Sequence, residues 1–291
     1  MEWLQQLVND LFLGGIYALL ALGYTMVYGI IKLINFAHGD VYMMGAFLGY
    51  FFIKHLHMNL WVALIATMAT TAILGVIIEI LAYRPLRKST RIAALITAIG
   101  VSFLLENTMT YFFGSSPRSF PQVMHIQKYD LGPISVSNIQ LLILAVSIIL
   151  MVLLQLIVKK TKMGKAMRAV SVDSDAAQLM GINVNRTISY TFALGSAWAG
   201  AAGVLIGLYY NSIDPLMGMT PGIKAFVAAV LGGIGIIPGA ALGGFVIGML
   251  ETISTAIGLS DYRDAVVYAV LIIILLVRPA GILGKNVKEK V

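Results

Sequence analysis

Apolar residues run along most of this chain in long blocks, and short polar stretches separate the blocks. A helix needs roughly 20 apolar residues to cross the hydrocarbon of a bilayer, and several blocks approach or reach that length. The alternating strands of about 10 residues that build an outer-membrane barrel are absent from the sequence. The pattern therefore predicts an all-α polytopic membrane protein, a bundle of eight or nine transmembrane helices. The candidate spans are residues 11–31, 41–54, 60–82, 92–113, 137–158, 188–210, 223–237, 240–258 and 265–282.

Two of these spans, 41–54 and 223–237, are too short to cross a bilayer comfortably. Both have Gly, Pro or polar residues at their ends. We expect them to be half-helices or re-entrant segments that are lined by protein. The number of crossings is eight if one of them does not cross.

Small residues recur at every fourth position in several spans: at Gly235, Gly239 and Gly243, at Gly244 and Gly248, and at Ala199, Gly203 and Gly207. Such ridges let helix backbones approach closely. The stretch "GGIGIIPG" superficially suggests a nucleotide-binding loop, but it lies inside an apolar block and lacks the Lys and Ser or Thr that such a loop needs. We therefore interpret these glycines as helix-packing positions.

Composition agrees with a membrane setting, because 59% of the residues are hydrophobic and only 11% are charged. The net charge of +7 does not indicate nucleic-acid binding, since the cations sit beside spans, where the positive-inside bias explains them. The basic segments 84–91 and 159–168 and the lysine-containing carboxyl-terminal tail are therefore predicted to be cytoplasmic. The first ten residues lack the basic start of a cleaved signal, so we expect the first block to be a true span.

The same orientation places the segment 114–136 and the amino terminus outside. This external loop contains Pro117, Pro121 and Pro133 around two semi-apolar stretches. It is expected to form a small hairpin or ordered cap, or else a plain connection.

No catalytic or metal-binding motif is visible in the sequence. The chain has no cysteine, which excludes disulfides and thiolate chemistry, and it has no P-loop, hydrolase elbow or zinc spacing. We therefore predict that it is not an enzyme and holds neither a metal nor a cofactor. If it moves a solute uphill, the energy must come from an ion gradient or a partner.

The largest predicted cytoplasmic loop, residues 159–187, contains a short helix that can be read from its caps. Asp175 is a suitable N-cap, Gln178 stands in the capping-box position, and Gly181 supplies a left-handed residue at the end. An isolated helix of this length is marginal in water, so we expect it to dock into something. It could dock into a partner or pack on the chain's own cytoplasmic ends.

This segment carries a resemblance to a known family. Residues 175–181 read "DAAQLMG" and resemble the EAA-xxx-G coupling motif of ABC importer permeases, with Asp175 where that motif usually has Glu. The stretches "LFLGGIYALLALGYTMVYGI", "INFAHGDVYMMGAF", "TKMGKAMRAV", "MGI" and "LLVRPAGILG" are similar to permeases of branched-chain amino acid ABC importers, specifically the H-type of the two paralogues. The resemblance covers nearly the whole chain.

The resemblance implies that residues 1–291 form a single transmembrane permease domain, with a coupling loop at 159–187 that fits a cleft on a separate ATPase subunit. The chain would provide half of the translocation path for branched-chain amino acids. The residues expected to take part in ATPase coupling are Gly164, Arg168, Asp175, Ala176, Ala177, Gln178, Leu179, Met180 and Gly181. For Arg168 a plain anchoring role beside the membrane is equally open.

The resemblance also implies partners and a location. The expected partners are a second homologous permease subunit, two ATPase subunits that bind and hydrolyse MgATP, a periplasmic or lipid-anchored substrate-binding protein, and membrane lipid. No cofactor is expected on this chain itself. The location implied is the bacterial cytoplasmic (inner) membrane, with several crossings and a cytoplasmic carboxyl terminus.

Polar groups inside the predicted spans are candidates for the path or gate, since burying one without a partner in hydrocarbon costs several kcal/mol. Asn35, His38 and Asp40 could instead cap the helix that follows them, and His38 could be a hydrogen-bonded interfacial residue or a proton relay. Glu79 could reach Arg84 or water. The candidates for the path or gate are Asn35, His38, Asp40, Tyr42, Glu106 and Glu251.

Three other functions stay open at this stage. The same machine could carry another small cargo, such as urea or an amide, because the coupling loop does not select cargo. A secondary transporter or channel driven by a gradient would need no ATPase and would depend on an intramembrane acid such as Glu106. A scaffold that transports nothing would have no need of a capped docking helix.

Overall fold

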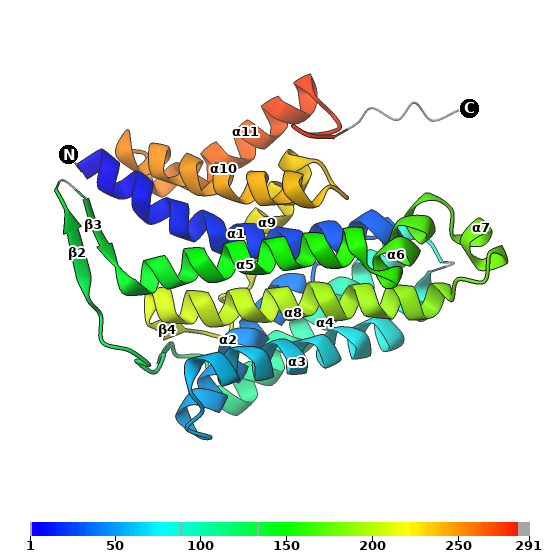
Figure 1. Ribbon diagram of the computed structural model, residues 1–291, viewed down its shortest axis with the longest axis horizontal. Helices are drawn as coiled ribbons and strands as arrows, with labels where there is room; N and C mark the ends of the chain where they lie inside the picture. Colours follow the sequence, from blue (N-terminus) through cyan, green and yellow to red (C-terminus); the bar gives the residue numbers. More distant parts are fainter. Residues whose placement is uncertain (1, 88, 133, 285–291) are drawn as a thin grey trace.

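The computed structural model describes residues 2–87, 89–132 and 134–284, and it is a bundle of helices with two small sheets at one end (Figure 1). A helix is found in each of the predicted spans. These helices are α1 (Glu2–Ile31), α2 (His38–Lys54), α3 (Leu60–Ile78), α4 (Arg91–Phe113), α5 (Asn138–Lys160), α8 (Val184–Tyr210), α9 (Met219–Gly232), α10 (Ile237–Ala256) and α11 (Arg263–Val277).

The connecting segments contain further short elements. Two helices, α6 (Lys162–Val172) and α7 (Ser174–Leu179), occupy the predicted cytoplasmic loop. The end of α3 continues into a π-helical turn, Glu79–Tyr83, and a 3-10 turn, Arg84–Leu86, and another 3-10 turn, Ser260–Tyr262, precedes α11. The strands are β1 (Arg118–Ser119), β2 (Lys128–Leu131), β3 (Ile134–Ser137) and β4 (Ser212–Ile213).

The prediction of a helical polytopic membrane protein is confirmed. Among the described residues, six helices are long and apolar enough to cross a membrane: α1, α3 with its two following turns, α4, α5, α8 and α10. The helix α9 is apolar but has only 14 residues, so it spans about 21 Å of a hydrocarbon layer of about 30 Å. The helices α2 and α11 have 17 and 15 residues. The eight or nine crossings stay a prediction.

Local chemistry explains where several helices begin and end. Ser137 and Gln140 form a capping box at the start of α5, and the Asn59 side chain accepts a hydrogen bond from Val62 N at the start of α3. The chain leaves α1 at Lys32, whose φ of +60° ends the helix. Residues 32–37 then form the short non-helical connection that leads to α2.

The strands gather at one end of the bundle, which we call the hairpin end (Figure 1). β2 and β3 pair antiparallel, from Lys128 with Ser137 to Leu131 with Ile134, so the predicted small hairpin is confirmed. Gln5 of α1 fastens the hairpin, since its amide donates to the Ser135 carbonyl at 2.7 Å and accepts from Ser135 N at 2.6 Å. β1 pairs with β4 and joins the segment after α4 to the segment after α8.

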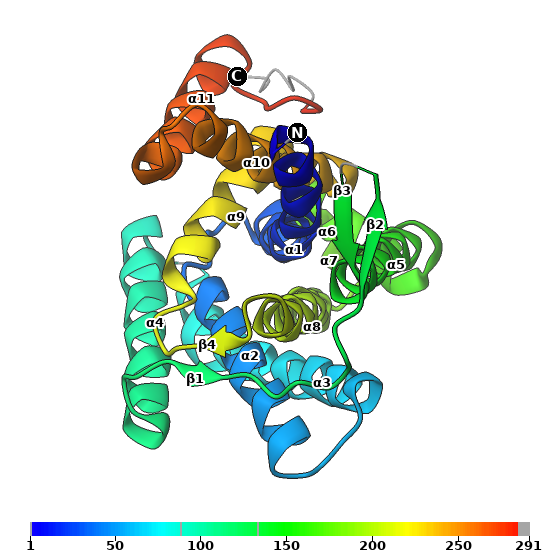
Figure 2. The ribbon, with the colours of Figure 1, turned by 90° about the vertical axis from the view of Figure 1, so that its left-hand side faces the viewer.

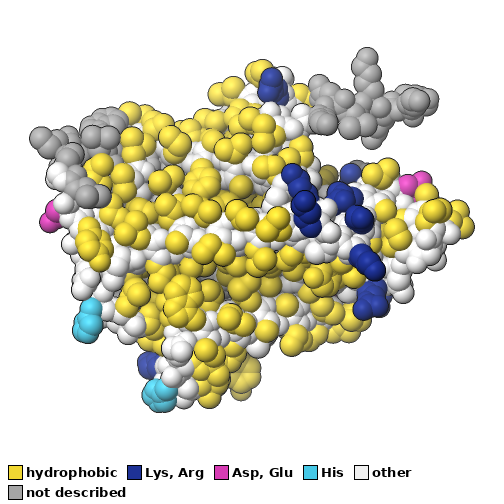
Figure 3. Space-filling view, in the orientation of Figure 1, with side chains coloured by type: hydrophobic (Ala, Val, Ile, Leu, Met, Phe, Trp, Pro, Cys, Tyr) yellow, Lys and Arg dark blue, Asp and Glu magenta, His cyan; other side chains and the backbone are white. Residues whose placement is uncertain are grey.

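The opposite end carries α6 and α7, and we call it the basic end. Most of the Lys and Arg side chains that are visible in the space-filling view gather there (Figure 3). The long flanks between the two ends are covered by apolar side chains in the same view. This distribution is the one expected for a bundle whose flanks face lipid.

The helices α1 and α8 occupy the centre of the bundle, as the view along its long axis shows (Figure 2). Both are mostly buried, whereas α4 is mostly exposed and stands at the periphery. The predicted small-residue ridges lie at the close contacts. A Cβ on Gly203 of α8 would meet the Tyr42 carbonyl of α2, and a Cβ on Gly244 of α10 would meet the backbone of Ala18 in α1. The helix-packing interpretation is confirmed for Gly203 and Gly244. It is wrong for Gly233 and Gly235, which have positive φ and lie in the turn between α9 and α10.

Candidate functional site

The short helix predicted in the loop 159–187 exists as α7, but its N-cap is not Asp175. The Asp173 side chain accepts hydrogen bonds from Asp175 N and Ala176 N, both at 2.9 Å, so Asp173 is the cap. Asp175 lies inside the first turn. The predicted cap was therefore wrong by two positions, because both aspartates are followed by residues that suit a first turn.

The end of α7 follows the prediction. Gly181 has a φ of +83°, and Gly181 N donates to the Gln178 carbonyl while Ile182 N donates to the Ala177 carbonyl, both at 3.0 Å. This pair of bonds is a Schellman motif, which satisfies the last carbonyls of the helix and fixes the direction of the chain that leaves it.

The surface of α7 divides into a buried side and an exposed apolar tip. Ala177 is buried against the chain, whereas Leu179 is 89% exposed and Met180 is 83% exposed. Ala176, Gln178 and Gly181 are also exposed. Two large apolar side chains at the tip of a six-residue helix are unusual for a free surface in water.

Gly164 and Arg168, which the sequence assigned to coupling, lie on α6 and fasten it to the end of α5. A Cβ on Gly164 would collide with the carbonyls of Ile157 and Val158, so the absence of a side chain lets α6 pack directly on α5. The Arg168 guanidinium donates to the same Val158 carbonyl. These contacts favour the anchoring role for Arg168, and a contact of either residue with an ATPase stays a prediction.

A groove separates α7 from the rest of the basic end. It encloses a cavity of about 820 Å³ between α7, the first turn of α8, the end of α1 and the 3-10 turn Arg84–Leu86. Its polar lining includes Arg84, Arg87, Asp175, Gln178, Asn183 and Asn185.

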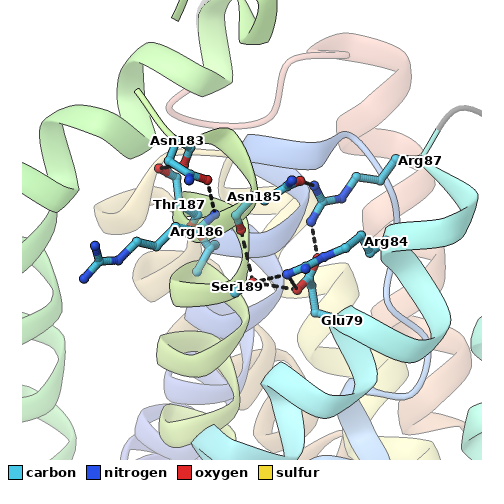
Figure 4. Close-up of polar contacts among 9 residues, drawn as sticks. Glu79, Arg84, Arg87, Asn183, Asn185, Arg186, Thr187 and Ser189 are labelled. Carbon is cyan, nitrogen blue, oxygen red and sulfur yellow. Dashed lines mark hydrogen bonds and ion pairs between the residues drawn. The ribbon is translucent and has the colours of Figure 1, made fainter. Parts of the chain in front are cut away.

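Three residues that line this groove, Arg84, Arg87 and Asn185, belong to a cluster of polar side chains around Glu79 (Figure 4). We call it the Glu79 cluster, and its members are Glu79, Arg84, Arg87, Asn185 and Ser189. The Glu79 side chain is fully buried. Arg84 Nη2 lies 3.0 Å from Glu79 Oε2, and Arg87 donates to Glu79 Oε1. The prediction that Glu79 reaches Arg84 is confirmed.

Two residues of α8 complete the cluster. Ser189 Oγ donates to Glu79 Oε2 at 2.6 Å and accepts from Arg84 Nη2 at 2.8 Å. Asn185 Oδ1 accepts from Arg87 Nη1 at 2.6 Å. The buried carboxylate is thus neutralised by two guanidinium groups, and the end of α3 is bonded to the first turns of α8.

Asn35 does not cap α2. Its Oδ1 accepts a hydrogen bond from the Tyr83 hydroxyl at 2.8 Å, and the N-cap of α2 is Ala37, whose side chain cannot cap. Tyr83 belongs to the π-helical turn that also contains Glu79. The loop before α2 is therefore tied to the end of α3.

His38 is almost completely buried in the first turn of α2, against α1. Its ring lies 4.7 Å from the Tyr24 ring in an edge-on arrangement, and a Cβ on Gly23 would collide with Nε2. Nε2 has no hydrogen-bond partner among the described residues. A tightly packed ring of this kind does not act as an exposed interfacial residue, and its role in a proton relay stays a prediction.

Asp40 and Glu106 are the two path candidates that the structure brings together. The Asp40 carboxyl, on α2, faces the Glu106 carboxyl and the Ser102 hydroxyl of α4. Gly218, just before α9, lies on the other side, and a Cβ there would stand 3.1 Å from Asp40 Oδ1. Acidic groups from two helices thus meet beside the break that precedes α9.

Glu251 lies apart from that pair, in a network of four helices. Lys224 Nζ of α9 lies 2.5 Å from Glu251 Oε1 of α10 and 2.6 Å from Asp264 Oδ1 of α11. The Tyr17 hydroxyl of α1 lies 3.3 Å from Glu251 Oε1. Tyr42 is buried at the crossing of α2 and α8. The six path candidates therefore do not form one site, and their role in a path stays a prediction.

Sequence reasoning missed the partners that make these groups stable. Lys224, Ser189 and Tyr83 stand far along the chain from the acids or amide that they contact, and they lie inside apolar helices or at their ends. Arg87 is only eight positions from Glu79, but it lies in the basic segment predicted to face the cytoplasm. Lys224, near the start of the predicted span 223–237, is one signal that could have been used, because a buried cation requires a carboxylate.

A second cavity, of about 660 Å³, lies at the hairpin end. It is bounded by the amino end of α1, the hairpin, the start of α5 and the end of α8. Its polar lining includes Gln5, Asn9, Lys128, Ser135, Gln140 and Asn211.

Comparison with known proteins identifies the family. A family model described as "Branched-chain amino acid transport system / permease component" matches residues 6–275. The chain is 43% identical to the high-affinity branched-chain amino acid transport system permease protein LivH of Salmonella typhimurium, over 100% of this chain and 98% of that protein. It is 42% identical to BraD of Pseudomonas aeruginosa, also a high-affinity branched-chain amino acid transport system permease protein, with the same coverage.

A solved structure extends the comparison to the fold. PsaBC from Streptococcus pneumoniae, in complex with Fab, superposes with a TM-score of 0.50 at 14% identity, covering 96% of this chain and 93% of the other. This likeness concerns the fold alone. The family model and the full-length relatives decide the assignment: the chain belongs to the permease components of branched-chain amino acid transport systems.

Proposed function

We propose that this chain is a permease subunit of a bacterial ABC importer that moves branched-chain amino acids and that it provides half of the translocation path. The relatives of 42–43% identity are permease proteins of such systems, and the similarity runs over the whole chain. The multi-pass bundle of apolar helices agrees with a membrane subunit that moves a solute.

The observation that carries the coupling part of this proposal is the tip of α7. Leu179 and Met180 stand almost fully exposed at the basic end, on a helix that Asp173 and Gly181 hold at both ends. A short, stiff helix with an apolar tip suits an apolar cleft on another protein. We assign that cleft to a separate ATPase subunit, which would bind and hydrolyse MgATP.

The remaining partners follow from the same proposal. A second, homologous permease would complete the path, two ATPase subunits would lie at the basic end, and a periplasmic or lipid-anchored binding protein would deliver the amino acid at the hairpin end. The positive-inside bias supports this orientation, because the basic end carries most of the visible Lys and Arg. The basic end and the carboxyl terminus would then face the cytoplasm across the inner membrane.

The test uses the complete importer in proteoliposomes, with uptake of leucine and of urea measured in separate arms. We expect ATP-dependent uptake of leucine and none of urea. The double variant Leu179→Asp/Met180→Asp should reduce leucine uptake at least tenfold, because two charges in an apolar cleft are costly to desolvate. Ile126→Asp is the matched control, since Ile126 is also exposed but lies at the hairpin end, and it should leave the ATPase association unchanged.

Three results would contradict the proposal. Uptake of urea but not of leucine would contradict the proposal that the cargo is a branched-chain amino acid. Full leucine uptake by the Leu179→Asp/Met180→Asp variant would show that α7 does not dock on the ATPase. Uptake by this chain without any ATPase, driven by an ion gradient, would replace the importer by a secondary transporter.

A further inference from the structure

The Glu79 cluster lies where three parts of the chain meet: the end of α3, the first turns of α8 and, through Tyr83, the loop before α2 (Figure 4). We propose that this cluster is the joint that carries a displacement of α7 to α3 and α2, with Glu79 as its positioning residue. The inference rests on the proposed function, in which an ATPase subunit binds α7.

The first step of the route is the short connection from α7 to α8. α7 ends at Leu179 and α8 begins at Val184, so only four residues separate them. The Schellman bonds at Gly181 and Ile182 fix the beginning of this connection, and the Asn183 side chain caps α8 by accepting from Arg186 N at 3.0 Å. Because this connection is short and held by hydrogen bonds at both ends, a displacement of α7 should move the first turn of α8 with it.

The second step crosses from α8 to α3 through polar bonds. Asn185 and Ser189 stand one turn apart on the same face of α8, and both point toward the end of α3 (Figure 4). Ser189 bonds to Glu79 and Arg84, and Asn185 bonds to Arg87. Directional hydrogen bonds resist sliding better than apolar contacts, because a shift of one ångström breaks them.

The third step passes through the π-helical turn Glu79–Tyr83. This turn interrupts the regular geometry of α3, and such turns occur frequently at functional sites. Glu79 at its start is bonded to α8, whereas Tyr83 at its end is bonded to Asn35 before α2. One irregular turn thus holds the beginnings of two helices, and a change in its geometry moves both.

Burial makes this joint stiff. Glu79 is fully buried, and the Arg87 side chain is only 16% exposed. Breaking the pair would leave an uncompensated buried charge, so the cluster moves as a unit. Beside it, the cavity of about 820 Å³ separates α7 from Arg84 and Arg87, which leaves α7 room to move toward the bundle.

The experiment measures leucine taken up per ATP hydrolysed by the complete importer in proteoliposomes. Ser189→Ala removes the bond from α8 to Glu79, and Tyr83→Phe removes the bond to Asn35, while each keeps the shape of its side chain closely. We expect the ratio of uptake to hydrolysis to fall about fivefold in each variant, the effect of one buried hydrogen bond. Glu79→Gln should lower the ratio further, and size-exclusion chromatography shows which variants assemble.

Two variants serve as controls and should keep the wild-type ratio. Ser254→Ala removes a buried hydroxyl that bonds only within α10, and Arg186→Gln removes a cation that points away from the cluster on the same turn of α8. A wild-type ratio of leucine uptake to ATP hydrolysis in both Ser189→Ala and Tyr83→Phe would contradict the proposal that the Glu79 cluster is a joint. If Leu179→Asp/Met180→Asp is uncoupled in that same experiment, docking of α7 stands and only the joint is wrong. If it also keeps the wild-type ratio, the docking itself is wrong.

Discussion

Lys224 shows how one residue can stabilise carboxylates inside this bundle. Its side chain is 4% exposed, and it bridges Glu251, which is 6% exposed, and Asp264, which is 44% exposed. Two carboxylates and one ammonium leave a net negative charge, which the Tyr17 hydroxyl and the partial exposure of Asp264 help to stabilise. Because Glu251 is buried and Asp264 is partly exposed, the loss of Lys224 should destabilise the protein mainly through Glu251.

We predict that Lys224→Met destabilises the protein by about 3–5 kcal/mol, because it leaves Glu251 buried without its cation. Glu251→Gln should cost clearly less, since Lys224 keeps Asp264 at 2.6 Å. The double variant Lys224→Met/Glu251→Gln should recover most of the loss. Thermal unfolding in lipid nanodiscs, followed by tryptophan fluorescence, measures the three variants, and an equal cost for the two single variants would contradict the pairing.

The acids were predictable from the sequence, but apart from Arg84 beside Glu79 their partners were not. Glu79, Glu106 and Glu251 stand out because each interrupts an apolar block. Several of the missed partners lie far along the chain: Ser189 is 110 positions from Glu79, and Tyr17 is 234 positions from Glu251. A single sequence carries no information about such pairs until the helices are placed in space.

At the scale of elements, α7 is defined by its two ends more than by its length. Six residues make less than two turns, so the helix depends on its caps and on the buried Ala177. The left-handed end at Gly181 was predictable because few residues other than glycine adopt that conformation without strain. The cap was not, because "VDSDAAQ" offers two aspartates and only the backbone geometry selects Asp173.

We therefore predict that Asp173→Ala weakens α7 by about 1 kcal/mol, because it removes the oxygen that accepts from Asp175 N and Ala176 N. Asp175→Ala should have a smaller effect, limited to the interaction of its charge with the start of the helix. Hydrogen–deuterium exchange of the α7 peptides is the measurement. Faster exchange in Asp175→Ala than in Asp173→Ala would show that Asp175, and not Asp173, caps α7.

At the scale of the whole molecule, α8 is the central helix, and its small residues set the distances to its neighbours. A Cβ on Gly203 would collide with the Tyr42 carbonyl and stand 2.7 Å from Ala46 N, both backbone atoms of α2. A Cβ on Gly200 would collide with Thr71 of α3. The positions of the helices along the chain were predictable from apolar blocks, whereas these neighbours depend on three-dimensional packing that no local pattern encodes.

We predict that Gly203→Ala costs about 1–3 kcal/mol, because the backbones of α2 and α8 must separate to admit the methyl group. Gly100→Ala in α4 is the matched control, since among the described residues its added Cβ would meet nothing within 4 Å beyond the neighbouring backbone of its own helix, and it should be neutral or slightly stabilising. Thermal unfolding of both variants in nanodiscs measures the two changes in stability. A loss of stability in Gly100→Ala equal to that in Gly203→Ala would show that packing is not the cause.

The short length of α9 has an electrical consequence. The backbone just before it, residues 214–218, is largely non-helical and must be lined by protein or water, because lipid cannot satisfy its polar groups. Water that reaches the start of α9 carries the potential of the solution from which it comes. The transmembrane voltage then falls over about 21 Å instead of about 30 Å, so the local field is steeper by nearly half. A charged solute that passes beside α9 would feel most of the membrane voltage within the length of that one helix.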